Sequence, residues 1–200
     1  MRWSEFDPSD ALFLAKKLRP AVERISTALR QYVRRHDSRL GSDCCAHASI
    51  GRELLEYDGI QAETVVGYAV WKIGNKPLDL MGFLPRNGLH QHTDDGPGLT
   101  YHAWIHSGRY VVDLTTYQLP QLAARLDVKH GGVARFDWSP AYLIVHESDV
   151  RSRRFVIDSS TAGSAYYEAR PELATRLHMQ LRPRFTDVAA VRQLMDKSAT

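Results

Sequence analysis

Cysteine is scarce in this chain, and its placement excludes a disulfide framework. The 200 residues contain only Cys44 and Cys45, which are adjacent. A disulfide between neighbouring residues is strained, because its geometry does not fit adjacent positions on an ordinary backbone. Proteins without disulfides are typical of reducing compartments. The cysteine content therefore predicts a cytoplasmic protein with two free thiols.

Long apolar runs are also absent. No stretch approaches the roughly 20 apolar residues that span a bilayer, and the first ten residues, MRWSEFDPSD, lack the apolar core of a signal peptide. We find no repeats and no low-complexity segment. A hydrophobic content of 44% is ordinary for a globular protein. We therefore expect no membrane partner and a single domain over 1–200, in which residues 1–40 form a helical extension.

A strong net charge is missing, although the N-terminal part is basic. The formal net charge of +3 is too small to indicate a nucleic-acid-binding protein. From Lys16 to Arg39, however, basic residues greatly outnumber acidic ones. The simplest interpretation is the solvated face of an amphipathic helix. A docking surface for an acidic partner or a nucleic acid is the alternative.

The first part of the chain has the pattern of helices. Apolar residues recur at spacings of three and four over 14–33. Pro20 is expected to divide this pattern, because proline suits the first turn of a new helix. A further helix is expected over 44–57, with the preceding Ser-Asp pair supplying its N-cap and an Asp-Gly pair ending it.

From residue 63 onwards the pattern is that of strands. β-branched and aromatic residues dominate 63–74. The segments 99–106 and 109–115 flank Ser107-Gly108 and predict a hairpin. Further strands are expected at 78–84, 141–146 and 153–158, and helices at 118–126 and 186–197. Helices followed by an antiparallel sheet predict an α+β fold.

Cys44 is the first candidate for chemistry. It lies at the expected start of a helix, where unpaired N–H groups carry partial positive charge. Such a position favours the thiolate, which is the nucleophilic form. The same N–H groups can bind a developing oxyanion. Cys45 is expected to be a packing residue, and His47, one helical turn from Cys44, is a weaker candidate base.

His102 and Asp113 are predicted to meet across the hairpin. A turn at Ser107-Gly108 places position 102 opposite position 113, and opposite side chains of an antiparallel pair share a face. The carboxylate can accept one ring N–H and leave the other nitrogen as a base. This is the logic of a nucleophile, base and acid triad, provided that the cysteine helix packs on the hairpin.

Five short motifs follow one another in a fixed order. They are Cys44 at a helix start, Gly59-Ile60, Gly67-Tyr68, His102-Ala103-Trp104 and Asp113-Leu114-Thr115. Over residues 41–116 this set resembles the transglutaminase-like family, within the papain-like class of cysteine hydrolases and transferases. Arylamine N-acetyltransferases share a similar order. The resemblance implies a cysteine helix packed on an antiparallel sheet, with Cys44, His102 and Asp113 as catalytic residues. Upstream of Cys44, no glutamine is identified as an oxyanion donor of the papain kind, so the second donor is unassigned.

Four further residues are candidates for substrate binding. Tyr68 and Trp104 belong to the motifs above, although core packing is the alternative for both. His90 and His92 lie in a glycine-rich loop, GLHQHTDDG, that precedes His102 and is expected to gate the site. A His-x-His pair beside carboxylates can also bind zinc or iron, so a metal site is the alternative for this loop.

The motifs predict an enzyme. Cys44 would attack an amide or carboxamide of a protein, a peptide or a small molecule, and water or an amine would complete hydrolysis, deamidation or transfer. No cofactor is expected. The alternatives are a catalytically inactive binding module of the same fold and a metal-binding protein that uses His90 and His92.

Overall fold

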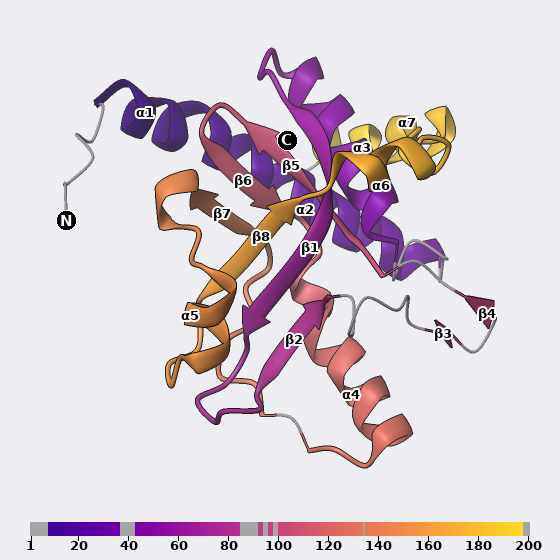
Figure 1. Ribbon diagram of the computed structural model, residues 1–200. Helices are drawn as coiled ribbons and strands as arrows, with labels where there is room; N and C mark the ends of the chain where they lie inside the picture. Colours follow the sequence, from indigo (N-terminus) through magenta and orange to yellow (C-terminus); the bar gives the residue numbers. More distant parts are fainter. Residues whose placement is uncertain are drawn as a thin grey trace.

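The computed structural model describes residues 8–36, 43–84, 92–93, 96–97, 100–133 and 135–197. The described part is an α+β structure in which an antiparallel sheet lies among helices (Figure 1). The α+β prediction is therefore confirmed. Within the described residues no helix is long and apolar enough to cross a membrane.

Helices occupy both ends of the described part of the chain and several connections. They are α1 (Pro8–Phe13), the π-helical turn η1 (Leu14–Leu18), α2 (Arg19–His36), α3 (Cys44–Tyr57), the 3₁₀ turns η3 (Thr116–Gln118) and η4 (Glu147–Asp149), α4 (Leu119–His130), α5 (Arg153–Asp158), α6 (Pro171–Arg176) and α7 (Phe185–Lys197). The π-helical turn ends two residues before Pro20, which has no N–H to donate to the preceding turn. Proline thus distorts the helix, as its position predicts.

The main sheet has the strand order β2-β1-β5-β6-β7, and β8 also pairs with β1. The strands are β1 (Glu63–Lys72), β2 (Leu80–Phe83), β5 (His102–Ser107), β6 (Tyr110–Asp113), β7 (Leu143–His146) and β8 (Ala165–Ala169); β3 (His92–Thr93) and β4 (Gly96–Pro97) form a separate pair. Gly67 of β1 pairs with both His102 and Ala169. The end of β8 therefore lies across β1 from the start of β5.

Close approach of β8 explains the glycine at position 67. A Cβ atom there would lie 1.9 Å from the carbonyl oxygen of Glu168, which no side chain tolerates. Because Gly67 has no side chain, the side chains of β8 and those of the start of β5 can meet across β1 on this face of the sheet.

Two predictions about secondary structure are wrong. The segment 153–158 was expected to be a strand and is α5, whose N-cap Ser152 accepts a hydrogen bond from the Phe155 N–H. The strand β8 and the helix α6 were not expected at all. The N-cap at Ser152 stabilises a helix over 153–158, and this outweighs the strand preference of the β-branched and aromatic residues in the segment.

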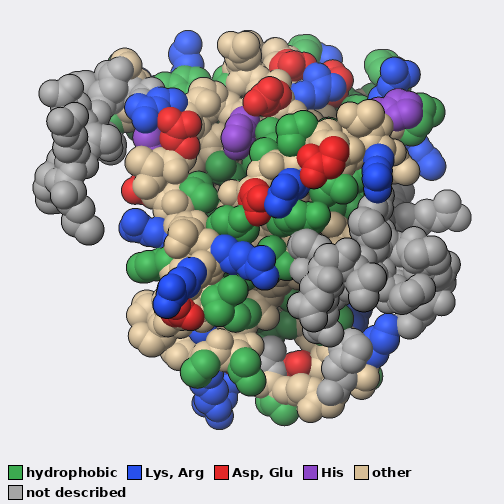
Figure 2. Space-filling model, in the orientation of Figure 1, with side chains coloured by type: hydrophobic (Ala, Val, Ile, Leu, Met, Phe, Trp, Pro, Cys, Tyr) green, Lys and Arg blue, Asp and Glu red, His purple; other side chains and the backbone are tan. Residues whose placement is uncertain are grey.

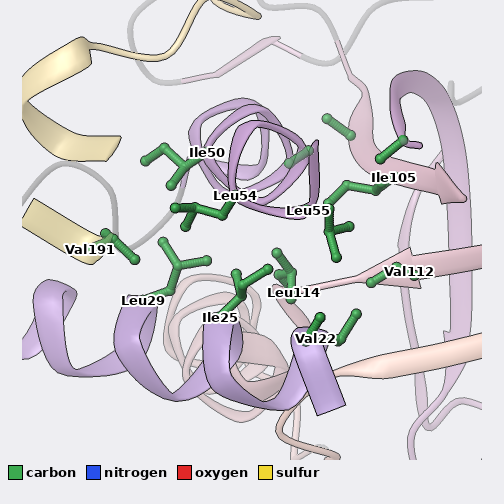
Figure 3. Packing of buried hydrophobic residues seen from close by; sticks show 14 of the residues in the cluster. Val22, Ile25, Leu29, Ile50, Leu54, Leu55, Ile105, Val112, Leu114 and Val191 are labelled. Carbon is green, nitrogen blue, oxygen red and sulfur yellow. The ribbon is translucent and has the colours of Figure 1, made fainter. Parts of the chain in front are cut away.

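One face of the sheet packs against α2, α3 and α7. Figure 3 shows side chains of α2 and α3 meeting those of the sheet and of α7. They include Val22, Ile25, Leu29, Ile50, Leu54, Leu55, Ile105, Val112, Leu114 and Val191. A second, smaller cluster joins Trp71 and Met81 to Leu119 of α4. The first cluster fixes α3 against β5, which the proposed chemistry requires.

Leu54→Ala tests this packing. Leu54 is 1% exposed, so the variant is expected to lose about 3 kcal/mol of unfolding free energy through lost burial and a cavity. Urea denaturation measures the change. Leu78→Ala is the matched control, because Leu78 is 90% exposed and should change stability by less than about 0.5 kcal/mol. Equal losses in the two variants would contradict the assignment of Leu54 to the core.

The surface carries charge of both signs. On the face seen in Figure 2, Lys and Arg side chains are interspersed with Asp and Glu. In α2, Arg24 forms an ion pair of 2.7 Å with Asp58, whereas Arg34 and Arg35 are exposed. These features fit a solvated basic face, and a nucleic-acid or acidic partner for α2 stays a prediction.

Candidate active site

The hairpin that carries the candidate base differs in register from the prediction. Ser107 pairs with Tyr110, so the turn is formed by Gly108 and Arg109, one residue later than expected. Gly108 has a φ of +57°, which favours glycine and explains the position of the turn. His102 is therefore the diagonal neighbour of Asp113, on the same face of the sheet, and not its direct partner.

The imidazole and the carboxylate nevertheless meet. His102 Nε2 lies 2.9 Å from Asp113 Oδ2, and both side chains are almost fully buried. Diagonal neighbours in antiparallel strands are within reach of long side chains. The structure thus brings together two of the three predicted triad residues.

Four donors surround the carboxylate of Asp113. Oδ2 lies 2.9 Å from His102 Nε2 and accepts from the Tyr167 hydroxyl at 2.9 Å. Oδ1 accepts from the N–H of Thr115 at 2.9 Å and from its hydroxyl at 2.7 Å. Burial is the largest influence and raises the pKa of Asp113, but the charge and hydrogen bonds of His102 and the bonds from Thr115 outweigh it. The net pKa is lowered, so Asp113 is ionised at neutral pH.

Tyr167 is the residue that sequence reasoning missed. It lies on β8, and its hydroxyl accepts from Trp71 Nε1 at 2.9 Å while donating to Asp113. Burial, followed by the charge of Asp113, raises the pKa of Tyr167 well above its usual value, so the hydroxyl stays protonated. The adjacent tyrosines at 166–167 favour a strand and were the available signal.

Aromatic rings hold the imidazole of His102 in place. The ring of Phe83 stacks on it at 5.4 Å between centroids, and that of Trp71 meets it edge-on at 4.9 Å. Trp104 lies parallel to it at 6.2 Å. His102 Nδ1 is buried and has no hydrogen-bond partner among the described residues. One ring nitrogen is therefore committed to Asp113, and the other is available as a base.

Cys44 is the first residue of α3. Asp43, one of the two predicted candidates, is the N-cap, and its side chain accepts from the Ala46 N–H at 3.0 Å. The helix ends at Tyr57 before Gly59, whose φ of +72° matches the expected C-terminal signal. Cys44 is half-buried, whereas Cys45 is fully buried among apolar side chains.

The environment of the Cys44 thiol differs from the expectation of an easily ionised group. A hydrogen bond with the Cys45 thiol and then burial raise the pKa of Cys44 well above its usual value, and the charge of Asp43 adds to this. The backbone N–H of Ala103 acts in the opposite direction but more weakly. The thiol is therefore neutral at rest, because a second thiol and burial outweigh the helix terminus.

Contact with the Ala103 N–H places the sulfur beside the residue that follows His102. Cys44 packs with the helix-side cluster, whereas the His102 ring contacts Trp71 and Phe83 on the other face of the sheet. The two groups thus approach the start of β5 from its two sides. In this arrangement the sulfur is hydrogen-bonded to the Cys45 thiol and to the Ala103 N–H. No hydrogen bond joins it to His102 Nδ1.

The candidate substrate-binding residues have different environments. Trp104 is buried against His102 and Tyr167, and its Nε1 has no partner among the described residues. Tyr68 is half-buried, with the guanidinium of Arg170 5.1 Å above its ring. Tyr101 is half-buried next to the thiols, and burial followed by the charges of Cys45 and Cys44 raises its pKa.

The histidine loop gives no geometry for a metal site. His90 and the side chain of His92 lie outside the described residues, although the backbone of His92 pairs with Pro97. Among the side chains that are described, no group of three His, Cys, Asp or Glu residues could hold a metal ion. Substrate or metal binding by His90 and His92 stays a prediction.

Comparison with known proteins supports the fold. No family model and no curated protein matches the chain. A solved structure described as "The crystal structure of genomics APC5867" is similar to it, with a TM-score of 0.56 at 16% sequence identity. The match covers 93% of this chain and 79% of that one. At this identity the likeness concerns the fold alone, and the α+β arrangement thus recurs in a solved structure.

Proposed function

We propose that the chain performs cysteine-dependent acyl chemistry on an amide or carboxamide, with a transglutaminase-like fold of the papain-like class. Cys44 is the nucleophile, His102 the base and Asp113 the acid that orients the imidazole. The observation that carries the proposal is the buried His102–Asp113 hydrogen bond, which leaves Nδ1 without a partner among the described residues, while the backbone N–H of the following residue, Ala103, contacts Cys44. The ordered motifs over 41–116 support the same roles.

The reaction begins with removal of the thiol proton. Because the pKa of Cys44 is raised, the sulfur needs a base, and the free Nδ1 of His102 can supply it. The proposal requires the Cys44 sulfur to leave Cys45 and to reach the imidazole at the start of β5. Ionised Asp113 then stabilises the imidazolium that forms.

Attack and release follow as two linked steps. The Cys44 sulfur bonds to the carbonyl carbon, the C–N bond breaks, and the proton on His102 Nδ1 passes to the leaving amine. The resulting thioester is then cleaved by water or by a second amine, whose proton passes to Nδ1 and from there to the departing Cys44 sulfur, which restores the neutral thiol. Water gives hydrolysis or deamidation, and an amine gives acyl transfer.

The oxyanion has two candidate donors. The Ala46 N–H already donates to the Asp43 side chain. The N–H of Cys44 itself, which has no intrahelical acceptor at the helix start, is therefore the first candidate donor. The Ala103 N–H loses its sulfur acceptor when the sulfur moves, and it can then serve as the second donor. The Ala103 N–H would thus be the second oxyanion donor, for which no side chain was identified in the sequence.

Acetylation by p-nitrophenyl acetate tests the proposal. The protein is expected to release nitrophenolate in a burst and to carry one acetyl group on Cys44, located by peptide mass spectrometry. His102→Gln should lower the burst rate by about 10²-fold or more, because the base is lost. His106→Gln is the control, since His106 lies on the same strand, is partly exposed and should matter less than about twofold. Acetylation of other residues only, or equal rates in both variants, would contradict the proposal.

An inactive binding module is the second candidate. Two features favour the inactive module: the hydrogen bond between the Cys44 and Cys45 thiols and the raised pKa of Cys44. Both keep the Cys44 sulfur in the neutral, unreactive thiol form. The acetylation experiment separates the candidates, since a folded module without activity gives no burst and no label on Cys44.

A further inference from the structure

We propose that His47 is a positioning residue, which ties the helix turn carrying Cys44 to the segment that follows Asp113. This inference rests on the proposed function, and it assigns a role to a buried histidine that the chemistry above does not use. His47 is 1% exposed and lies on α3, one turn after Cys44.

Both ring nitrogens of His47 have partners. Nδ1 lies 2.9 Å from the carbonyl oxygen of Asp43, and Nε2 lies 3.0 Å from the hydroxyl of Tyr117 and 3.4 Å from the side-chain nitrogen of Gln118. The Gln118 amide donates to the same hydroxyl at 3.0 Å. His47 therefore connects the N-cap residue of α3 with the turn η3.

The partner of Nδ1 determines which nitrogen of the ring carries the proton. A carbonyl oxygen can only accept, so Nδ1 carries the proton and donates to Asp43. Nε2 then carries no proton and accepts, from the Tyr117 hydroxyl at 3.0 Å or from the more distant Gln118 amide. The ring is neutral in this arrangement, and burial, the largest influence, lowers the pKa of His47 in agreement with it. Because Nδ1 donates to Asp43 and Nε2 is occupied by Tyr117, His47 is not placed to act as the base for Cys44.

The network joins the two halves of the proposed site. At one end, Asp43 directly precedes Cys44 and caps the helix. At the other end, η3 begins immediately after Thr115, which binds Asp113 through its N–H and hydroxyl. The bond between His47 and Tyr117 thus limits how far the sulfur can move from the His102–Asp113 pair. Small displacements of reacting groups are enough to lower rates severely.

Tyr117→Phe and His47→Leu test the tether. Tyr117→Phe removes only the hydroxyl and should lower acetylation of Cys44 about 10-fold, and His47→Leu about 100-fold. His47→Gln, whose amide can still accept from Tyr117, should retain more of the rate than His47→Leu. Ser49→Ala is the matched control, because it removes another buried hydrogen bond of α3, that to the Cys45 carbonyl at 2.7 Å, and should change the rate by less than about twofold.

A second measurement keeps the two proposals separate. Alkylation of Cys44 by iodoacetamide needs no acyl transfer, and loosening the tip of α3 should raise it about threefold in Tyr117→Phe while acetylation falls. With rates corrected for the folded fraction by circular dichroism, an unchanged alkylation rate in both Tyr117→Phe and His47→Leu overturns the positioning role. Absence of acetylation in the unmodified protein, with alkylation still raised in Tyr117→Phe, overturns the proposed function and leaves the tether supported.

Discussion

Cys44→Ala is expected to abolish acetylation by p-nitrophenyl acetate, with a fall of at least about 10³-fold in the burst rate. The sulfur is the atom that forms the new bond, and alanine offers no substitute. The variant should remain folded, because Cys44 is half-buried and its truncation costs only about 1 kcal/mol. Stopped-flow absorbance measures the burst, and circular dichroism checks the fold.

Cys45→Ala is the matched control for this prediction. It removes the neighbouring thiol whose hydrogen bond is the largest cause of the raised pKa of Cys44. The pKa of Cys44 should then fall, and acetylation at neutral pH should be as fast as in the unmodified protein or faster. If Cys45→Ala lost the burst while Cys44→Ala kept it, the roles of the two cysteines would have to be exchanged.

Asp113→Asn is expected to destabilise the protein by about 3 kcal/mol and to lower acetylation by about 10³-fold. The carboxylate accepts from four surrounding donors, and an amide in its place turns one acceptor into a donor facing them. Loss of the acceptor at His102 Nε2 also removes the constraint on the ring. Urea denaturation and the acetylation burst measure the two effects, with exposed Asp149→Asn as the control.

The stability effect of Asp113 depends on pH in a definite direction. Its pKa is lowered in the folded protein, so its ionised form contributes stability above the pKa of an unfolded aspartate, about 4. That contribution is lost as the pH falls through the lower folded pKa. The difference in unfolding free energy between the unmodified protein and Asp113→Asn should therefore shrink below about pH 4. A gap that widened towards acid would show that Asp113 is protonated in the fold.

Local signals were sufficient to predict the helix that carries Cys44. Asp43 caps it and Gly59 follows its end in the left-handed conformation, and both effects depend on a few neighbouring residues. The meeting of His102 and Asp113 was also predicted, although with the wrong register. It survived the error because a shift of two residues keeps both side chains on the same face.

The remainder of the site depends on contacts between distant parts of the chain. Tyr167 reaches Asp113 only because β8 pairs with β1 on the edge opposite β5, a pairing that no local pattern specifies. The raised pKa of Cys44 likewise follows from burial and from the orientation of Cys45, whereas position at a helix start alone predicts a lowered one. Sequence patterns predict which residues have suitable chemistry, and tertiary packing decides their ionisation.

A crystal structure of the protein after alkylation with iodoacetamide tests the central claim most directly. The account predicts an adduct on the Cys44 sulfur, turned away from Cys45, with Nδ1 of His102 within about 4 Å of the sulfur and the adduct oxygen near the N–H groups of Cys44 and Ala103. An adduct on Cys45, or a Cys44 sulfur that no rotation brings within reach of the imidazole, would contradict it.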